Sequence, residues 1–145
     1  MKILVLNGPN LNLLGLSGDR SYGTRNLREI NDEMQSVAGA AGADIQFLQS
    51  NHEGVLIDQV HSAILDRSYD AIIFNPGPLR HSSLGLADAI RAFHGSVYEV
   101  HVQRQGESEF RHPTIMKSDR QFCGTAEKIY LEALNVLLHQ GEGRE

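Results

Sequence analysis

The chain has 145 residues and a formal net charge of −5, with 41% hydrophobic and 21% charged residues. This is one domain's worth of ordinary globular composition, which excludes a disordered chain and a collagen-like repeat. The acidic balance argues against nucleic-acid binding. No apolar run reaches the ~20 residues of a membrane helix, and the start turns polar too soon for a signal peptide. We therefore expect a soluble, cytoplasmic protein without a membrane partner, a single domain over 1–145 with a frayed tail at 140–145.

Short apolar runs alternate with amphipathic stretches, the pattern of a parallel sheet covered by helices. The first helix is expected to begin after Thr24 as N-cap, and one of the serines at 82 and 83 is expected to cap the third. Five strands and four helices in strict alternation predict an α/β, flavodoxin-like, doubly wound parallel sheet with helices on both faces. Strands are predicted at 2–6, 44–49, 71–75, 96–101 and 121–123, and helices at about 27–41, 53–66, 83–92 and 125–139.

Two connections, 7–23 and 102–120, are too long to be simple turns, and long loops in compact α/β domains are usually functional. Amide and imidazole side chains also follow four of the predicted strands. Because ligands of open α/β sheets bind beyond the carboxyl ends of the strands, these groups should gather at one edge and suit a polar, hydroxylated small molecule. They are Asn7, Asn10, Asn12, Asn51, His52, Asn75, His81 and His101.

Other site chemistries match poorly. The segment 8–15 fits neither the dinucleotide fingerprint nor the Walker loop, since a proline and leucines would obstruct a phosphate cradle. The seven histidines are scattered without metal-ligand spacing. The G-x-S-x-G elbow of hydrolases is absent, and the single Cys123 favours a buried structural thiol. The sequence predicts neither a metal nor an organic cofactor.

Five segments together resemble the type II 3-dehydroquinate dehydratases, in the same order along the chain. The resemblance spans about residues 1–138, and its first two motifs are long enough to be specific. It is carried by ILVLNGPNLNLLG at 3–15, QSNHEG at 49–54, IFNPG at 73–77, EVH at 99–101 and EFRH at 109–112.

The resemblance implies dehydration of 3-dehydroquinate to 3-dehydroshikimate without metal or cofactor. In the family a tyrosine removes a C2 proton to give an enolate, and a histidine protonates the departing C1 hydroxyl. By position, Tyr22 matches the base and His101 the acid. Asn12 matches an amide that helps to hold the enolate or a water.

The resemblance also implies substrate-binding residues and an assembly. The family forms trimers, usually four of them in a dodecamer, in which a carboxylate from a neighbouring subunit reaches the site; Asp88 matches that carboxylate. The backbone of Val102 and Gln103 matches the segment that receives the substrate carboxylate. The substrate-binding positions are Asn75, His81, Asp88, Val102, Gln103 and Arg111.

These residues suit the chemistry on their own terms. An enolate needs hydrogen-bond donors at its oxygen, which Asn12 or Asn75 could supply. Glu99 lies two residues before His101, on the same face of a strand, so its carboxylate could hold an imidazolium ready to donate. From spacing alone, a hydrogen-bonded structural histidine at a strand end is an equal alternative. A Schiff-base route would need a lysine in the pocket, and of the three lysines only Lys117 falls in a loop.

The chain departs from the family in the loop that carries the tyrosine. The family pattern G-x-R-x-P-x-x-Y-G becomes GLSGDRSYG at 15–23, which puts Ser17 at the position of the essential arginine. A free phenol has a pKa of about 10, so a phenolate base near neutral pH needs a nearby cation. Arg20 could supply it from the same loop or be a solvated charge; Arg80 and Arg104 are further candidates.

Three functional hypotheses remain. The first is an active dehydratase, acting in aromatic biosynthesis or in quinate breakdown. The second is a weakly active or non-catalytic homologue that binds a quinate-like or shikimate-like acid. The third, a flavin or nucleotide module on the same fold, would be revealed by yellow colour or copurifying nucleotide.

Overall fold

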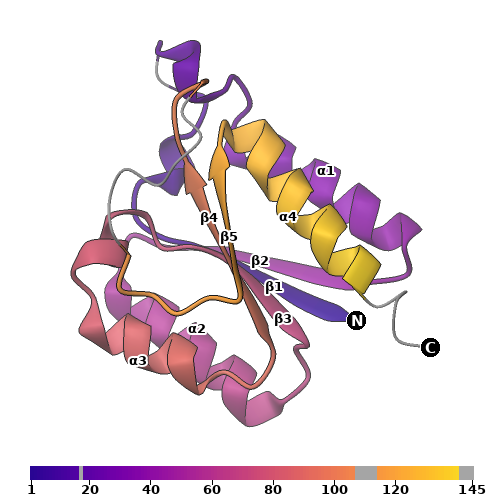
Figure 1. The fold of residues 1–145 in the computed structure, drawn as a ribbon, viewed down its shortest axis with the longest axis vertical. Helices are drawn as coiled ribbons and strands as arrows, with labels where there is room; N and C mark the ends of the chain where they lie inside the picture. Colours follow the sequence, from indigo (N-terminus) through magenta and orange to yellow (C-terminus); the bar gives the residue numbers. More distant parts are fainter. Residues whose placement is uncertain (17, 107–113, 141–145) are drawn as a thin grey trace.

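The computed structural model describes residues 1–16, 18–106 and 114–140 and has a five-stranded, all-parallel sheet at its centre (Figure 1). The spatial order is β2-β1-β3-β4-β5, so β1 and β3 are neighbours at the point where the chain reverses its direction across the sheet. This confirms the predicted flavodoxin-like fold. The strands are β1 (Lys2–Asn7), β2 (Asp44–Gln49), β3 (Ala71–Asn75), β4 (Ser96–Val102) and β5 (Arg120–Gly124).

Two helices cover each face of the sheet, with α1 and α4 on one side and α2 and α3 on the other (Figure 1). Among the described helices, none has the length and hydrophobicity that crossing a bilayer would require. Three short 3-10 helices lie in the loops at the carboxyl edge of the sheet. The helices are α1 (Leu27–Ala40), α2 (Glu53–Asp66), α3 (Leu84–Ala92) and α4 (Ala126–Gln140), and the 3-10 helices are η1 (Leu11–Leu13), η2 (Arg20–Tyr22) and η3 (Gly77–His81).

The period of two along the central strands divides the core. Ile3 and Val5 of β1 point to the cluster under α1 and α4, whereas Leu4 and Leu6 point to the cluster under α2 and α3. All four are at most 1% exposed, which explains the continuously apolar sequence of this strand.

The helix starts follow local hydrogen bonding, and one prediction about them was wrong. Asn26, not Thr24, is the N-cap of α1: its side chain accepts a hydrogen bond from the backbone N–H of Glu29, whose carboxylate accepts one from the N–H of Asn26. This reciprocal capping box satisfies two helix-end donors, which Thr24 stands too early to do. For α3, Ser83 caps the helix as predicted, accepting from the N–H of Leu86.

The loops that follow β1 and β3 touch backbone to backbone at the carboxyl edge. The N–H of Gly8 donates to the carbonyl of Asn75 at 2.8 Å. A Cβ at Gly8 would lie 2.4 Å from the Pro76 oxygen, and one at Gly77, whose φ is +58°, would lie 2.9 Å from the Pro9 oxygen. Only glycine permits so close an approach, and it brings the two loops together at the point where the strand order reverses.

Candidate active site

A cavity of about 370 Å³ opens at this carboxyl edge. The loop after β1 and residues Asn75, Gly77 and Pro78 after β3 form two of its walls. The end of β4 adds His101 and Val102, and Tyr22 with Gly23 closes it from η2. A cavity at the switch point of a doubly wound sheet is where this class of fold binds small molecules.

Below the cavity a buried tyrosine joins the ends of β1 and β3. Tyr130 of α4 donates its hydroxyl to Asn7 Oδ1 at 2.5 Å and accepts from Asn75 Nδ2 at 2.9 Å. Asn75 Oδ1 in turn accepts from the N–H of Gly77 at 3.1 Å. All three side chains are at most 1% exposed, and burial raises the pKa of the Tyr130 phenol. The phenol therefore stays neutral and fixes the orientation of the Asn75 amide.

A buried ion pair lies at the same edge on the other face of the sheet, which α2 and α3 cover. Arg80 of η3 and Glu99 of β4 are 1% and 0% exposed, with Arg80 Nη2 3.6 Å from Glu99 Oε1. Thr114 donates its hydroxyl to the same oxygen at 2.9 Å. Burial raises the pKa of Glu99, against the opposing effects of Thr114 and Arg80. We call the two buried clusters at this edge of the sheet, Asn7–Asn75–Tyr130 and Arg80–Glu99–Thr114, the floor; of their members, Asn75 lines the cavity.

At the outer side of the cavity lies a cluster that we call the rim: Asp19 and Tyr22 line the cavity, and Ser21 and Arg104 contact them. Asp19 caps η2, accepting from the N–H of Ser21 at 3.0 Å and from its hydroxyl at 2.6 Å. These hydrogen bonds, aided by the charge of Arg104, lower the pKa of Asp19. Arg104 Nε lies 3.2 Å from the Tyr22 hydroxyl oxygen. The rim is exposed, with Tyr22 itself 38% accessible.

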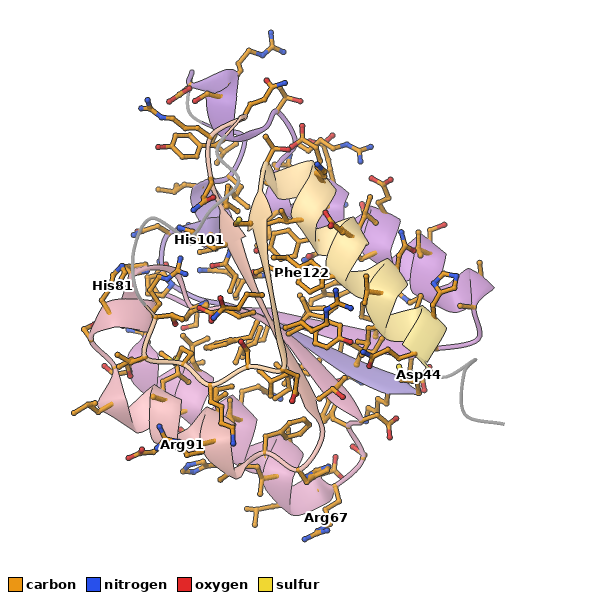
Figure 2. All side chains as sticks on the ribbon, in the orientation of Figure 1. Asp44, Arg67, His81, Arg91, His101 and Phe122 are labelled. Atoms are coloured by element: carbon orange, nitrogen blue, oxygen red, sulfur yellow. The ribbon has the colours of Figure 1, made fainter. Side chains whose placement is uncertain are left out.

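The structure brings some of the predicted site residues together and leaves others apart. Tyr22, Asn75, His101 and Val102 line the cavity. Figure 2 shows His81 and His101 at the same end of the sheet, away from Asp44 and Arg67. The other predicted residues do not line this cavity in the described part of the chain: Asn12, Arg20, His81, Asp88, Glu99 and Gln103.

Several of these residues have contacts of another kind. Asn12 Oδ1 lies 3.4 Å from the amide nitrogen of Gln49, so it joins the loop after β1 to the end of β2. Gln103 is buried, and its N–H donates to the carbonyl of Gly124. Asp88 on α3 pairs with Arg91 at 3.1 Å. Arg111 and Ser17 lie outside the described residues.

Sequence reasoning did not find the apolar wall of the cavity. Leu11, Leu13 and Leu14 line it together with Ala126 of α4. The leucines were noted in the sequence only as an obstacle to phosphate binding, and no signal there tied position 126 to the site. Within residues 1–16, 18–106 and 114–140, no three His, Cys, Asp or Glu side chains gather as metal ligands would.

Comparisons with known proteins agree with this fold. A curated 3-dehydroquinate dehydratase of Caldicellulosiruptor bescii is 39% identical over 139 residues, which cover 94% of this chain and 95% of the relative. One from Bacillus pumilus is 39% identical over 141 residues, covering 95% of each chain. A crystal structure of type II dehydroquinase from Butyrivibrio crossotus superposes with a TM-score of 0.84 at 35% identity, covering 94% of this chain and 97% of that one.

The fold and the cavity at its switch point define a flavodoxin-like α/β protein with a small-molecule site at the carboxyl edge of the sheet. The family model described as dehydroquinase class II matches residues 1–138. The chain therefore belongs to the class II dehydroquinase family, as the sequence motifs indicated.

Proposed function

We propose that the protein is a lyase that dehydrates 3-dehydroquinate to 3-dehydroshikimate. The observation that carries this proposal is the cavity at the switch point, which Tyr22, Asn75 and His101 line together. Those are the residues that the resemblance assigns to the base, to substrate binding and to the acid. The chain belongs to the class II dehydroquinases. The relatives named above are themselves 3-dehydroquinate dehydratases, which supports the proposal.

The proposed reaction has two proton transfers. The Tyr22 phenolate takes a proton from C2, and the electron pair of that C–H bond moves to the carbonyl oxygen as an enolate. When the carbonyl re-forms, the C1 hydroxyl leaves with a proton from His101 as water, and a C1–C2 double bond remains. Donors near the enolate oxygen lower the barrier. Asn75 meets the cavity directly, while Asn12 stands beside it and could act through a water.

Tyr22→Phe tests the proposal directly. Turnover would be followed by the ultraviolet absorbance of the conjugated product, with Tyr69→Phe as the matched control. The Tyr69 hydroxyl donates to Gln46 on β2 and does not line the cavity. We expect Tyr22→Phe to lower turnover by at least about a hundredfold, the usual contribution of a general base. The control should leave it unchanged.

Two results would count against the proposal. Equal turnover in wild type and Tyr22→Phe would remove Tyr22 from its role. Binding of 3-dehydroquinate without any turnover in the wild type would instead make the protein a non-catalytic binder of such acids.

The same proposal includes a homo-oligomer, at least a trimer and, by the resemblance, a dodecamer of four trimers. In this subunit the side chain of Asp88 is 75% exposed on α3, where a neighbouring copy could use it. Mixing Tyr22→Phe with Asp88→Ala subunits should restore part of the activity if each site takes its carboxylate from a neighbour. No recovery in oligomers shown to have exchanged subunits would contradict this.

A further inference from the structure

The contact between Arg104 and Tyr22 joins two loops that are far apart in the sequence. Arg104 follows β4 and Tyr22 ends η2, yet Nε of the arginine lies 3.2 Å from the phenolic oxygen. The guanidinium carbon lies 5.5 Å from the centre of the tyrosine ring. Beside them, the N–H of Gln105 donates to the carbonyl of Ser21 at 2.7 Å. This backbone hydrogen bond holds the two loops in register, so the side-chain contact does not depend on two long side chains alone.

The direction of the hydrogen bond gives the contact a chemical consequence. A guanidinium has only donors, so the phenolic oxygen accepts. A phenolate accepts a charge-assisted hydrogen bond, which is stronger than the bond that a neutral phenol accepts. The contact therefore favours the ionised form of the tyrosine over the protonated form.

Within residues 1–16, 18–106 and 114–140, the other nearby arginines have different surroundings. Arg25 lines the cavity but pairs with Glu33, and Arg80 is buried beside Glu99. Arg20 belongs to η2 and, like Arg104, is exposed and does not line the cavity. What distinguishes Arg104 is its contact with the Tyr22 oxygen.

Among the residues that the structure describes, two carboxylates and one histidine are the other titratable groups around the tyrosine. Asp19 carries its negative charge on the rim and accepts both hydrogen bonds from Ser21. Glu127 of α4 accepts from the N–H of Thr24, and His101 faces the same cavity. Both carboxylates oppose ionisation of a neighbouring phenol, so a cation in direct contact with it matters more.

We propose that Arg104 is a positioning residue that acts through Tyr22, holding its oxygen toward the cavity and favouring the phenolate that serves as base. The inference rests on the proposed function, because it concerns the base of that reaction. It assigns the cation to the loop after β4 rather than to the loop that carries the tyrosine.

The first test measures ionisation without substrate. The chain has four tyrosines, and burial raises the pKa of Tyr69, Tyr98 and Tyr130. The phenolate absorbance transition that disappears in Tyr22→Phe would be assigned to Tyr22. In Arg104→Met this transition should move to higher pH by about one unit, and in Arg104→Lys by less. Arg20→Met is the matched control and should not move it.

The second test measures turnover against pH in the same variants. For Arg104→Met we expect kcat at neutral pH to fall about tenfold, or ~1.4 kcal/mol, with a smaller change in KM. The pH of half-maximal turnover should rise alongside the absorbance transition. A residue that merely supports the loop would lower turnover at every pH without moving the profile. Unchanged melting temperatures would show that the variants fold.

The outcomes separate the two proposals. An absorbance transition that Arg104→Met leaves in place, or that Arg20→Met moves equally, overturns the inference about Arg104. A wild-type protein without turnover overturns the proposed function, while the absorbance titration still decides whether Arg104 favours the phenolate.

Discussion

The floor and the rim of the cavity hold their polar groups in different ways. On the floor, Asn75 and Tyr130 are 55 positions apart in the sequence, fully buried and bonded to each other. On the rim, Asp19 and Ser21 are two positions apart, and their hydrogen bonds are exposed to solvent. Buried polar groups are costly to leave without partners, whereas exposed groups exchange a lost partner for water.

This difference explains where the sequence could change without losing the fold. Replacing a floor residue leaves its buried partners without a hydrogen bond and out of reach of water, so it lowers the free energy of unfolding. The rim can lose or gain a charge with little effect on folding. Arg104 lies in the loop after β4 at this edge of the sheet. Under the proposed function, the rim carries the base Tyr22, and substitutions there should change the chemistry more than the stability.

The largest expected effect on stability is that of Glu99→Gln. It leaves the buried Arg80 guanidinium beside a neutral amide, which costs about 3–5 kcal/mol because an arginine cannot give up its proton. Urea unfolding at neutral pH would measure it. Adding Arg80→Met in the same chain should recover much of the loss. A single variant as stable as wild type would mean that the floor is not a coupled unit.

Arg80→Met should behave differently with pH. Burial raises the pKa of Glu99 in the folded protein above its value in the unfolded chain. The carboxyl therefore contributes its full stabilisation below the unfolded-state pKa, and this contribution is lost as the pH rises through the folded-state pKa. Without Arg80 the carboxyl can take up a proton. We therefore expect the variant to lose little stability at about pH 5 and more toward pH 8. A loss that does not change over this interval would contradict the assignment.

Tyr130→Phe should have the next largest effect and lower the free energy of unfolding by about 2–4 kcal/mol. It removes one hydroxyl and leaves the buried amides of Asn7 and Asn75 each without that partner, at roughly 1–3 kcal/mol apiece. Tyr69→Phe is the control, because Gln46 is exposed and can turn to water. Equal losses in the two variants would show that burial of the partners does not set the cost.

Asn26→Ala tests the N-terminus of α1. It removes the side-chain half of the capping box of α1 and should cost about 1 kcal/mol in urea unfolding, with turnover unchanged. Thr24→Ala, two residues earlier, should cost less. The opposite order would restore Thr24 as the residue that starts the helix.

The smallest effect is expected on the rim, from Asp19→Asn. The asparagine keeps an oxygen for the Ser21 N–H but removes a negative charge near Tyr22 and Arg104. Thermal stability should not change measurably. The phenolate absorbance transition assigned to Tyr22 should shift to lower pH, opposite to the shift in Arg104→Met. A shift in the same direction as Arg104→Met would contradict the charge argument.

The fold could be predicted from the sequence because its signals are local and repeated. Continuous apolar runs such as 3–6 and 71–74 belong to strands buried on both faces, and the helices between them keep a regular spacing. The N-cap of α1 was missed because Thr24 and Asn26 are both capping residue types, and the deciding partner is Glu29.

From the strand pattern alone, the cavity lining was predictable only at the strand ends, whereas Tyr22 was predicted from the family resemblance. Asn75 and His101 are strand residues, so the carboxyl edge of the sheet places them. Arg104 could be named as a candidate, but three arginines competed, and only the meeting of the two loops distinguishes them. Nor does the sequence show that Asn75 is held by Tyr130, since that contact joins β3 to a helix 55 residues later.

The close approach at Gly8 and Gly77 limits what mutation can explore in this protein. In a saturation library over the two loops, positions 8 and 77 should return almost only glycine, since any side chain would collide with the opposite backbone. New specificity must then come from neighbours such as Leu13 and Pro78, which line the cavity. A search for altered substrates should therefore randomise around the two glycines and leave them in place.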